Sequence, residues 1–383
     1  MRRSDPRPSR RRFLGAAGTV VAATGAAGCD APSAKPPQPS AAAADAPVPP
    51  TGRYQAGVTI PQPAQPGLLA VVADLDDSAA PGPLLAELGR TVVALTAGTD
   101  PRLLGLAPGD LTITIGVGPR LVRKAGAALP GAADLPPFSR ERIPAQARGG
   151  DLLIQLCAGD ALVLPVAAAA LLDQAGARVT ERWRQSGRRG PNTTVAAGRT
   201  APRNLLGFID GIVGPATPSD QERDLWLSTP APVAGGSIAV VRRMELDLAR
   251  FAALSVAEQE AVFGRHRDTG VPLSGGTIAD NPVLGAKTSD GRYLIPANAH
   301  VRRANSNVVG AGLMLRRSYS IDDPTPGLLF VCFQNDLRTF TATLTHMEAS
   351  DALLQFTVTT ASATFLILPG FDEQRPLGST LFG

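Results

Sequence analysis

NLLGFIDGIVGP, residues 204–215, places a single carboxylate, Asp210, between apolar residues and glycines. An aspartate is seldom buried without a partner, so Asp210 belongs either in a solvated turn or in a site that uses its charge. Asp-Gly is a common turn dipeptide, and on this stretch alone a turn is the simpler interpretation. The rest of the chain decides between these two possibilities.

The first 28 residues have the form of a twin-arginine (Tat) export signal. The run SRRRFL (9–14) precedes an uncharged stretch of small residues (15–28), which matches the basic start and weakly apolar middle of such a signal. The stretch is too short and too weakly apolar for a stable membrane span. AAGC, ending at Cys29, resembles a lipobox, although Ala26 stands where leucine is usual. Lipid attachment at Cys29 and ordinary cleavage nearby both stay open, and we expect an extracytoplasmic protein (periplasmic, cell-envelope or secreted).

Residues 29–66 are rich in Ala, Pro and Ser, a composition that predicts a disordered linker. Removing the six arginines and the one aspartate that precede Cys29 changes the formal net charge from +4 to −1. Nucleic-acid binding depends on clustered Lys and Arg. We therefore expect no nucleic-acid partner, and contact with a membrane only through a lipid on Cys29.

From residue 67 on, apolar segments of strand length alternate with helix-like segments. In order along the chain they span 67–75, 83–98, 111–118, 151–159, 162–176, 235–246, 255–264, 313–321, 327–336, 348–357 and 363–370. Each half therefore offers about four strands with helices between them, which is typical of an α+β domain with helices on one sheet face. We predict two modules, 67–200 and 201–383, related by a weak internal duplication.

Two cysteines, Cys157 and Cys332, lie inside strand-like apolar runs. We interpret them as core residues, with a disulfide as the alternative in an oxidising compartment. The sequence has no CxxC or HxxxH pair, so a zinc site is not expected.

Three histidines make a short census possible. His266 lies among charges at a helix end and is interpreted as a solvated surface residue. His346 precedes an expected helix and is expected to face water. His300, in IPANAHVRRANSN, follows a proline-bounded loop and is either structural or a ligand.

Arg316 and Arg317 are neighbours in the strand-like run LMLRRSYS (313–320). Adjacent strand residues point to opposite faces of a sheet, so one of these two arginines faces inward. A buried cation needs an anion or a function. Asp210 and a buried arginine could supply each other.

Five segments together carry a family resemblance. RNLLGFIDG, GGSIAVVRRMELDL, AHVRRANSN, LMLRRSYS and GLLFVCFQNDL resemble the dye-decolorising haem peroxidases, in particular their Tat-exported branch that accompanies ferrous iron uptake. The likeness runs in order from about residue 67 to residue 383 and includes GDLLIQLCAGD in the first half. The Gly-x-x-Asp-Gly pattern alone is weak in a glycine-rich chain, and the ordered set is specific. The resemblance implies an α+β fold of two ferredoxin-like modules, each a four-stranded antiparallel sheet with helices, and one haem b per chain held in the C-terminal module.

The resemblance also implies roles for individual residues. His300 would be the proximal haem ligand through neutral imidazole. Asp351 matches the family's proximal carboxylate, with Glu348 as the rival. Asp210 would be the acid–base group on the other haem face, and Arg316 would stabilise charge that develops on the leaving oxygen.

Further residues would contact the cofactor. Glycine lets the backbone run close to a flat group, and the expected contacts are Gly211, Ile212, Val213, Arg302, Asn305 and Ser318. The family commonly has Ala-Asn-Pro-Arg after the histidine, whereas this chain has Ala-Asn-Ser-Asn at 304–307. The positive contact to a haem propionate is therefore either missing or supplied by Arg302 or Arg303.

Three functions follow from these observations. The first is an exported haem b peroxidase that uses H₂O₂ to oxidise phenolic or dye-like donors or ferrous iron. The second is a haem-handling protein, a deferrochelatase component of an iron-uptake system with its own partner proteins. The third is a cofactor-free, lipid-anchored binding protein in which Asp210 and Arg316 form a structural ion pair. A homo-oligomer is expected in each case.

Overall fold

The apolar segments form one antiparallel sheet of nine strands. A computed structural model describes residues 46–196 and 199–383. The strands are β1 (Gly67–Leu75), β2 (Thr112–Val117), β3 (Leu152–Ala158), β4 (Val179–Arg188), β7 (Ser237–Leu246), β8 (Leu315–Arg316), β9 (Tyr319–Ile321), β10 (Gly327–Gln334) and β11 (Thr357–Ile367). Their order is β7-β11-β2-β3-β1-β4-β9-β10-β8, and β7 also pairs with β10, which closes the sheet into a barrel-like ring.

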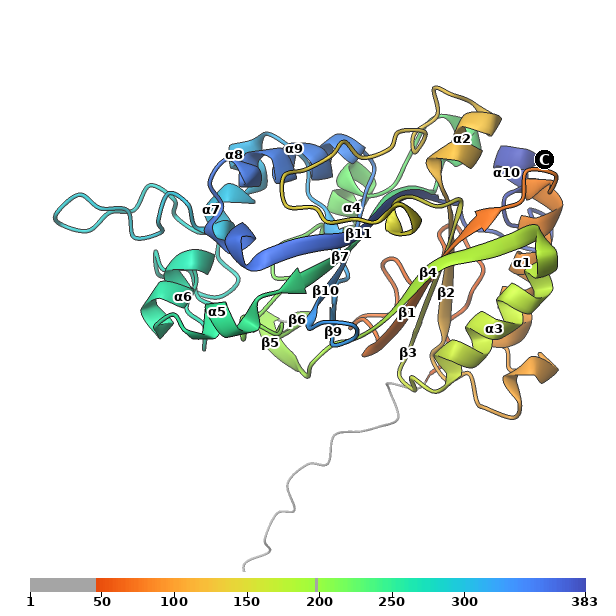
Figure 1. Ribbon diagram of the computed structural model, residues 1–383, viewed down its shortest axis with the longest axis horizontal. Coiled ribbons are helices and arrows are strands. Elements are labelled where there is room, and N and C mark those ends of the chain that lie inside the picture. Colours follow the sequence, from red (N-terminus) through yellow and green to blue (C-terminus); the bar gives the residue numbers. More distant parts are fainter. Residues whose placement is uncertain (1–45, 197–198) are drawn as a thin grey trace, which may run out of the picture. The chain divides into compact units, whose positions relative to one another are not determined.

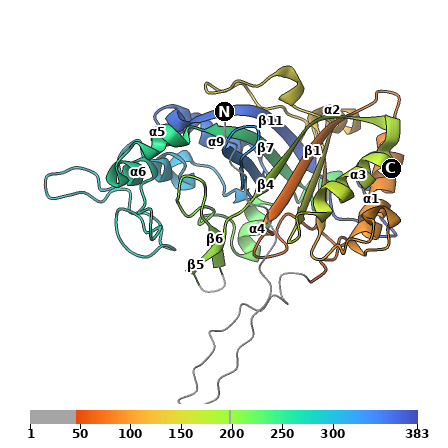
Figure 2. The ribbon, with the colours of Figure 1, turned by 60° about the horizontal axis from the view of Figure 1, so that its bottom comes forward.

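Ten α-helices accompany the strands in the described residues. They are α1 (Pro81–Thr96), α2 (Pro119–Ala125), α3 (Val163–Ala175), α4 (Pro218–Asp224), α5 (Leu248–Ala252), α6 (Val256–Phe263), α7 (His300–Arg303), α8 (Ser306–Val309), α9 (Leu337–Glu348) and α10 (Ser379–Phe382). In Figures 1 and 2, α1 and α3 lie beside β1–β4, whereas α5–α9 lie at the other end, beside β7 and β11. Within residues 46–196 and 199–383, no helix combines the length and apolar character needed to cross a membrane.

The first half places β1–β4 in the order β2-β3-β1-β4 with α1 and α3 on one face. Helix α1 buries Leu84, Leu88, Val92 and Leu95, and this spacing of three or four residues is what puts them on one face of a helix. These side chains join a large core with the inward residues of the four strands. The prediction of an α+β fold is confirmed here.

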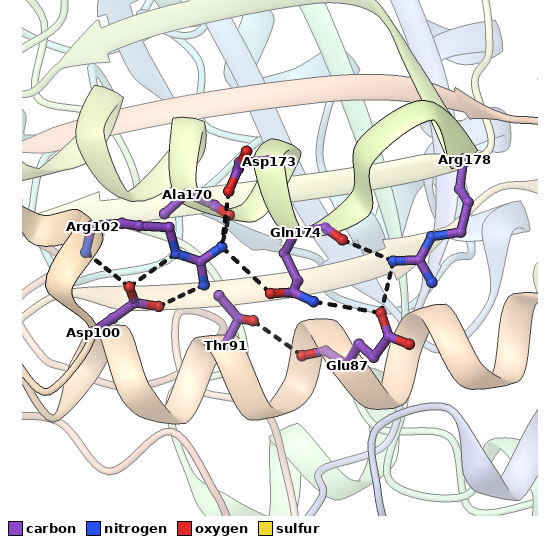
Figure 3. Close-up of polar contacts among 8 residues, drawn as sticks. All are labelled: Glu87, Thr91, Asp100, Arg102, Ala170, Asp173, Gln174 and Arg178. Carbon is purple, nitrogen blue, oxygen red and sulfur yellow. Dashed lines mark hydrogen bonds and ion pairs between the residues drawn. The ribbon is translucent and has the colours of Figure 1, made fainter.

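A polar network joins α1 to α3 at the outer side of this core (Figure 3). Arg102 donates from Nη2 to Asp100 Oδ2 over 2.7 Å, and Arg178 donates from Nη2 to Glu87 Oε2 over 2.7 Å. The Arg102 guanidinium holds the pKa of the buried Asp100 carboxyl below its usual value. Gln174 connects the two pairs through contacts with Arg102 and Glu87. This cluster holds helices together and leaves no buried charge unpaired.

The second half contributes β7–β11 and is joined to the first by two strand pairings. Leu366 in β11 pairs with Val117 in β2, and Ser320 in β9 pairs with Arg188 in β4. The chain beyond β11 then returns to the first half, where Leu377 packs in the same core as α1. The last residues of the chain therefore complete the core of the first half.

The link between the halves is the hairpin of β5 (Asn192–Ala196) and β6 (Arg199–Pro202). The predicted boundary near residue 200 falls within β6. The polypeptide leaves this hairpin directly into the stretch that contains Asp210.

The predicted linker over 29–66 is wrong for its C-terminal part. Ala56 and Val58 are buried, and the Gln55 amide donates to Ile115 O and Leu368 O while its oxygen accepts from Ile115 N. The prediction failed because it used the average composition of the segment, which is rich in Pro and Ala. Such an average does not reveal the few residues that pack into the core. Residues 1–45, which include the predicted export signal (1–28), Cys29 and the start of the predicted linker, lie outside the described residues.

The two cysteines of the folded part are buried free thiols. Cys157 lies in β3 and Cys332 in β10, and burial raises the pKa of both thiols. The interpretation as core residues is confirmed, and the alternative of a disulfide between them is wrong.

Candidate functional site

Asp210 follows a tight turn instead of forming one. The turn spans 204–208, where Asn204 Oδ1 accepts from the N–H groups of Leu206 and Phe208 and Gly207 has a φ of +84°. The Asp210 N–H then donates to Pro202 O over 2.9 Å, which fixes the backbone of Asp210 beside β6. The simpler interpretation of Asp210 as a turn residue is therefore wrong.

Gly211 gives the Asp210 carboxylate its direction. Gly211 has a φ of +80°, which glycine adopts without strain, and its N–H donates to Asp210 Oδ1 over 2.7 Å. A Cβ on Gly211 would meet nothing within 4 Å. The backbone here thus borders open space, as expected for a segment that lies against a bound group.

Asp210, Gly211, Arg316 and Ser318 line one cavity of about 20 Å³. Two of the buried polar atoms at its edge have no partner in the described residues, namely Arg316 Nε and Ser318 Oγ. Arg316 donates from Nη2 to Val213 O over 3.1 Å. Within residues 46–196 and 199–383 it makes no ion pair with Asp210, so the expected structural pair between them is wrong.

Arg317 is the arginine that faces inward, on the opposite side from Arg316. It is buried and donates to Val58 O over 3.0 Å and to Gln65 Oε1 over 3.1 Å. The prediction that the two arginines point in opposite directions is confirmed. Neutral oxygens of the segment before β1 accept from both Nη atoms of Arg317, whereas its buried Nε has no partner in the described residues. Arg316 is the arginine that borders the cavity.

His300 lies in the single-turn helix α7 and is oriented by a buried carboxylate. The Nδ1 atom of His300 lies 2.8 Å from Asp351 Oδ2, and the Asp351 side chain is fully buried. Asp351 Oδ1 accepts from the Leu353 N–H over 2.8 Å, which fixes the carboxylate. Glu348 instead accepts from the backbone N–H and the hydroxyl of Ser139. Asp351, and not its rival, therefore holds Nδ1 and leaves Nε2 as the ring nitrogen available to a ligand.

Two phenylalanine rings connect His300 to the Asp210 segment. Phe208 stacks on Phe263 with ring centroids 3.8 Å apart, and Phe263 meets the His300 ring at 6.1 Å in an edge-to-face arrangement. Residues separated by about 90 positions in the sequence thus share one small apolar cluster. His300 and Asp210 consequently border the same region of the C-terminal half.

The other residues expected after His300 have structural partners. Arg302 donates to the carbonyl oxygens of Leu284, Ile295 and Pro296, and Arg303 donates to His346 O. Asn305 Oδ1 accepts from the N–H groups at the start of α8 and so caps that helix. The arginine pair that was expected to reach an anionic group is therefore occupied with backbone carbonyls.

The structure places the other two histidines, His266 and His346, in different surroundings. His266 is half-exposed, and its Nδ1 atom lies 3.0 Å from Glu260 Oε2. His346 lies inside α9 and not before a helix, and its Nδ1 donates to Arg303 O over 2.7 Å. The expectation that His346 faces water is therefore wrong, because α9 packs on α7 and α8.

Sequence reasoning missed Arg265, which lies in the loop after α6. Its Nη1 donates to Gly270 O and Ile278 O, and its buried Nη2 has no partner in the described residues. Burial lowers the pKa of Arg265, and the nearby charge of Arg316 lowers it further. In the sequence this arginine lies in the charged run GRHRD, and no feature of that run distinguishes it from the other charged residues there.

The loop that carries Arg265 touches both sides of the site. A Cβ on Gly264 would come within 2.4 Å of Val301 Cγ1 in α7, and a Cβ on Gly270 within 3.2 Å of Ile209 Cδ1. The loop therefore spans from the His300 helix to the Asp210 segment. Arg265 lies at the edge of the region that these two residues border.

These groups fit an iron porphyrin. A neutral imidazole with a carboxylate on its other nitrogen is a common proximal ligand for haem iron. The partnerless Arg265 Nη2 offers a donor to an anionic carboxylate such as a haem propionate, and the partnerless Arg316 Nε lies at the edge of the cavity beside Asp210. Open space beside Gly211 suits a flat group.

Comparison with known proteins agrees with this geometry. The family pattern described as "Dyp-type peroxidase, N-terminal" matches residues 55–189, and "Dyp-type peroxidase, C-terminal" matches residues 201–372. A dye-decolorizing peroxidase of Thermobifida fusca is 36% identical over 305 residues, which cover 72% of this chain and 68% of that protein. A deferrochelatase of Escherichia coli strain UTI89 is 29% identical over 365 residues, 86% of each chain.

Solved structures show the same likeness. A DyP-type peroxidase from Streptomyces coelicolor superposes with a TM-score of 0.82 at 31% identity, covering 90% of this chain and 100% of that one. DtpA from Streptomyces lividans in its ferric form gives the same TM-score, identity and coverage. With both halves matched in order and the histidine, carboxylates and arginine in place, the chain belongs to the Dyp-type peroxidase family and is a haem peroxidase.

Proposed function

We propose that the protein is an exported haem b peroxidase that reduces H₂O₂ and oxidises phenolic or dye-like donors or ferrous iron. The observation that carries this proposal is the His300–Asp351 pair, joined through Phe263 to the segment that presents Asp210. Haem, when bound, supplies the iron centre at which the peroxide O–O bond breaks and from which the donor is oxidised. The remaining work belongs to side chains of this chain.

On the proximal side, His300 would bind the haem iron through Nε2, the ring nitrogen that Asp351 leaves available. Its Nδ1–H donates to Asp351, and this charged hydrogen bond makes the imidazole a stronger electron donor. Asp351 is itself fixed by the Leu353 N–H, so the His300 ring is held in one orientation. The pair thereby favours the more oxidised states of the metal.

On the distal side, Asp210 moves protons and Arg316 holds charge. Asp210 takes the proton from the peroxide oxygen nearer the iron and returns it to the farther oxygen, work worth roughly 10²–10⁴-fold in rate. Arg316 donates hydrogen bonds to the oxygen that leaves with negative charge. The Gly211 N–H holds one carboxylate oxygen of Asp210 and leaves the other free of partners in the described residues.

Further groups would hold the cofactor. Gly211, Ile212 and Val213 would lie against it, and Ser318 would contribute the partnerless hydroxyl of the cavity. Arg265 would bind a propionate through its partnerless Nη2, whereas Arg302 and Arg303 donate to backbone carbonyls. Arg302 and Asn305 support the cofactor indirectly, because they fix the helices on either side of residue 304.

The absorption spectrum tests this proposal. The purified protein is expected to show a Soret band that changes when H₂O₂ is added and recovers when a phenolic donor or ferrous iron is supplied. A Soret band that does not respond to peroxide would contradict the peroxidase assignment. A protein that binds no haem under any loading condition would contradict the cofactor as well.

A second candidate function is haem handling within an iron-uptake system. The observation in its favour is the likeness to deferrochelatases, which extends over 86% of both chains for the relative from strain UTI89. Incubation with excess haem and a ferrous-iron chelator separates the two. Peroxide-independent release of iron with recovery of intact porphyrin would favour haem handling, whereas turnover of donor with intact haem favours the peroxidase.

We further propose export by the Tat pathway, with Cys29 as a possible lipid attachment point. The run SRRRFL followed by small residues supports this proposal. Replacing the paired Arg10 and Arg11 by lysine should strand the protein in the cytoplasm, as fractionation and immunoblotting would show. Undiminished export of that variant would refute the assignment, and a Cys29→Ala variant released from the membrane fraction would establish the lipid anchor.

We also propose that each half is a ferredoxin-like module. The first half has the strand order β2-β3-β1-β4, and the second has β11-β7-β10 followed by the short strands β8 and β9. In both halves the first and third strands of the module are central neighbours and the helices lie between strands in the sequence. These orders support the predicted internal duplication.

A further inference from the structure

The short helix α7, which carries His300, depends on its neighbours for its position. It has only four residues, and a helix of one turn is not stable alone, because few hydrogen bonds offset the cost of ordering its backbone. Its N-cap residue is Ala299, which has no side-chain oxygen for the first N–H groups. Contacts with other segments therefore decide where the His300 ring lies.

Two side chains of α7 attach it to two different segments. The Arg302 guanidinium donates to three carbonyls of the irregular loop before the helix, those of Leu284, Ile295 and Pro296. Arg303 instead reaches α9, which lies beside α7 (Figure 1). The contact of Arg303 is the one that bears on the proximal carboxylate, because that carboxylate follows α9 in the chain.

Arg303 and His346 are joined by two hydrogen bonds that run in opposite directions. The His346 Nδ1 atom donates to Arg303 O over 2.7 Å, and Arg303 Nη2 donates to His346 O. Because a carbonyl oxygen can only accept, Nδ1 carries the proton in the neutral imidazole. The last carbonyls of a helix have no partner within it, and His346 supplies one for α7. Both bonds end on main-chain oxygens, so the Arg303–His346 pair holds one backbone against the other.

The buried face of α9 places His346 for this contact. Thr339, Phe340 and Thr343 are the buried residues of the helix, and His346 follows Thr343 by three positions. Residues three or four apart lie on the same face of a helix. The face that packs on β10 therefore continues to α7, where the His346 side chain is half-buried.

The end of α9 also places the carboxylate that orients His300. The Asp351 N–H donates to Met347 O over 2.7 Å, which attaches Asp351 to the last turn of the helix. Asp351 Oδ2 lies 2.8 Å from His300 Nδ1. The Arg303–His346 pair and the His300–Asp351 pair therefore connect the same two segments of the chain.

These contacts hold α7 at both of its ends. Before the helix, Asn298 O accepts from the Ala352 N–H over 2.8 Å, next to Asp351. After His300, the Arg303–His346 pair holds the C-terminal end. Without that pair the helix could pivot about its N-terminal contacts. Hydrogen bonds weaken steeply as their angle departs from linear, so such a rotation would weaken the bond between His300 and Asp351.

We propose that His346 is a positioning residue for the proximal histidine. It holds the C-terminal end of α7 on α9 and so keeps His300 Nδ1 aligned with Asp351. It acts on His300 through Arg303 and the helix backbone. The consequence for the iron rests on the proposed function, since the alignment affects the metal only where His300 Nε2 binds it. The alignment itself belongs to the protein and can be measured without haem.

Variants of His346 separate this role from general stability. His346→Leu removes the donor to Arg303 O, whereas His346→Asn keeps an N–H donor two bonds from Cβ, as Nδ1 is, and should restore the contact. Thr345→Leu is the matched control on α9, because Thr345 is the exposed neighbour of His346. Phe340→Leu is the control for stability, because it disturbs the core under α9 and leaves His346 in place.

NMR of the apoprotein with ¹⁵N-labelled histidine measures the alignment. The Nδ1 proton of His300 should exchange with water several-fold faster in His346→Leu than in the wild-type protein. His346→Asn, Thr345→Leu and Phe340→Leu should stay close to wild type. Equal exchange in the wild-type protein and His346→Leu would overturn the proposal. An equal acceleration in Phe340→Leu would assign the effect to lost stability and would overturn it as well.

Spectroelectrochemical titration of the haem-loaded protein tests the consequence for the iron. His346→Leu should raise the midpoint potential in the same direction as Asp351→Asn and by less, because it weakens the bond that Asp351→Asn removes. In the Asp351→Asn background, His346→Leu should add no further shift, since two changes that act through one contact are not additive. Shifts that add would overturn the proposal. A protein that binds no haem would refute the proposed function, and the apoprotein exchange rates would still decide the role of His346.

Discussion

Replacing Asp351 by asparagine removes the charged hydrogen bond between the proximal carboxylate and His300. Asparagine keeps the size of the side chain, but when its single amide oxygen accepts the Leu353 N–H that Asp351 Oδ1 accepts over 2.8 Å, its NH₂ group replaces the oxygen opposite His300 Nδ1. The charge opposite His300 Nδ1 is lost. Because the Asp351 side chain is fully buried, solvent and salt screen this charge little.

The expected size of the effect follows from one hydrogen bond. A hydrogen bond to a charged partner contributes about 1.5–3 kcal/mol. If that free energy stabilises the ferric over the ferrous iron, its loss raises the midpoint potential by about 65–130 mV, since a one-electron couple shifts 59 mV for each tenfold change. The variant should also bind haem, because His300 is retained.

Spectroelectrochemical titration of the Soret band measures this shift. Glu348→Gln is the matched control, because Glu348 contacts Ser139 and not His300. Its midpoint should equal that of the wild-type protein. An Asp351→Asn midpoint within about 20 mV of wild type, well under the shift of one such hydrogen bond, would refute the reasoning. An equal shift in both variants would point to a general electrostatic effect instead of the His300 contact.

Other substitutions test the remaining assignments. His300→Ala should abolish or greatly weaken the Soret absorbance, while His266→Ala should leave it intact; a normal spectrum in His300→Ala would show that another group binds the iron. Asp210→Asn should slow the reaction with peroxide while haem stays bound, and Arg316→Leu should slow it roughly 10²–10³-fold, the usual scale for one preorganised donor. Because both residues act in one transition state, the double variant should lose less than the product of the single losses, and stopped-flow rates that multiply would contradict a shared step. Arg265→Leu should speed transfer of haem to apomyoglobin without removing the Soret band, and an unchanged transfer rate would exclude a propionate contact.

The sequence alone located the parts of the site that are carried by ordered motifs. Asp210, His300 and Arg316 each lie in a segment that carries the family resemblance, and the resemblance in EASDALLQF favours Asp351 over Glu348. The strands of the first half are also predictable, because β1 and β3 are nearly continuous apolar runs and β2 is rich in the β-branched residues Thr, Ile and Val. The local sequence pattern is sufficient to predict an element where its own apolar residues make it buried.

Other parts depend on contacts that no local pattern encodes. Arg189, which follows β4, lies over the ring of Tyr319, a residue far away in the sequence. Arg265 donates to carbonyls of the irregular loop that follows it, so nothing in either neighbourhood distinguishes these residues from surface arginines. The anchoring of Val58 depends on Arg317, 259 residues away. Helix α9 was missed because its outward face is polar and only Thr339, Phe340 and Thr343 are buried.

The route of the chain end has a consequence for synthesis on the ribosome. Leu366, Leu368, Phe371 and Leu377 lie in the same core as α1 and α3, although almost 300 residues separate Leu377 from the start of α1. Domains ordinarily fold from the N-terminus while translation continues, but here the first half lacks part of its interior until the final residues have been made. Nascent chains stalled before β11 should therefore be cut rapidly by protease in both halves. Protease resistance should appear only once the segment through Leu377 has left the ribosome, because until then the apolar interior of the first half is incomplete.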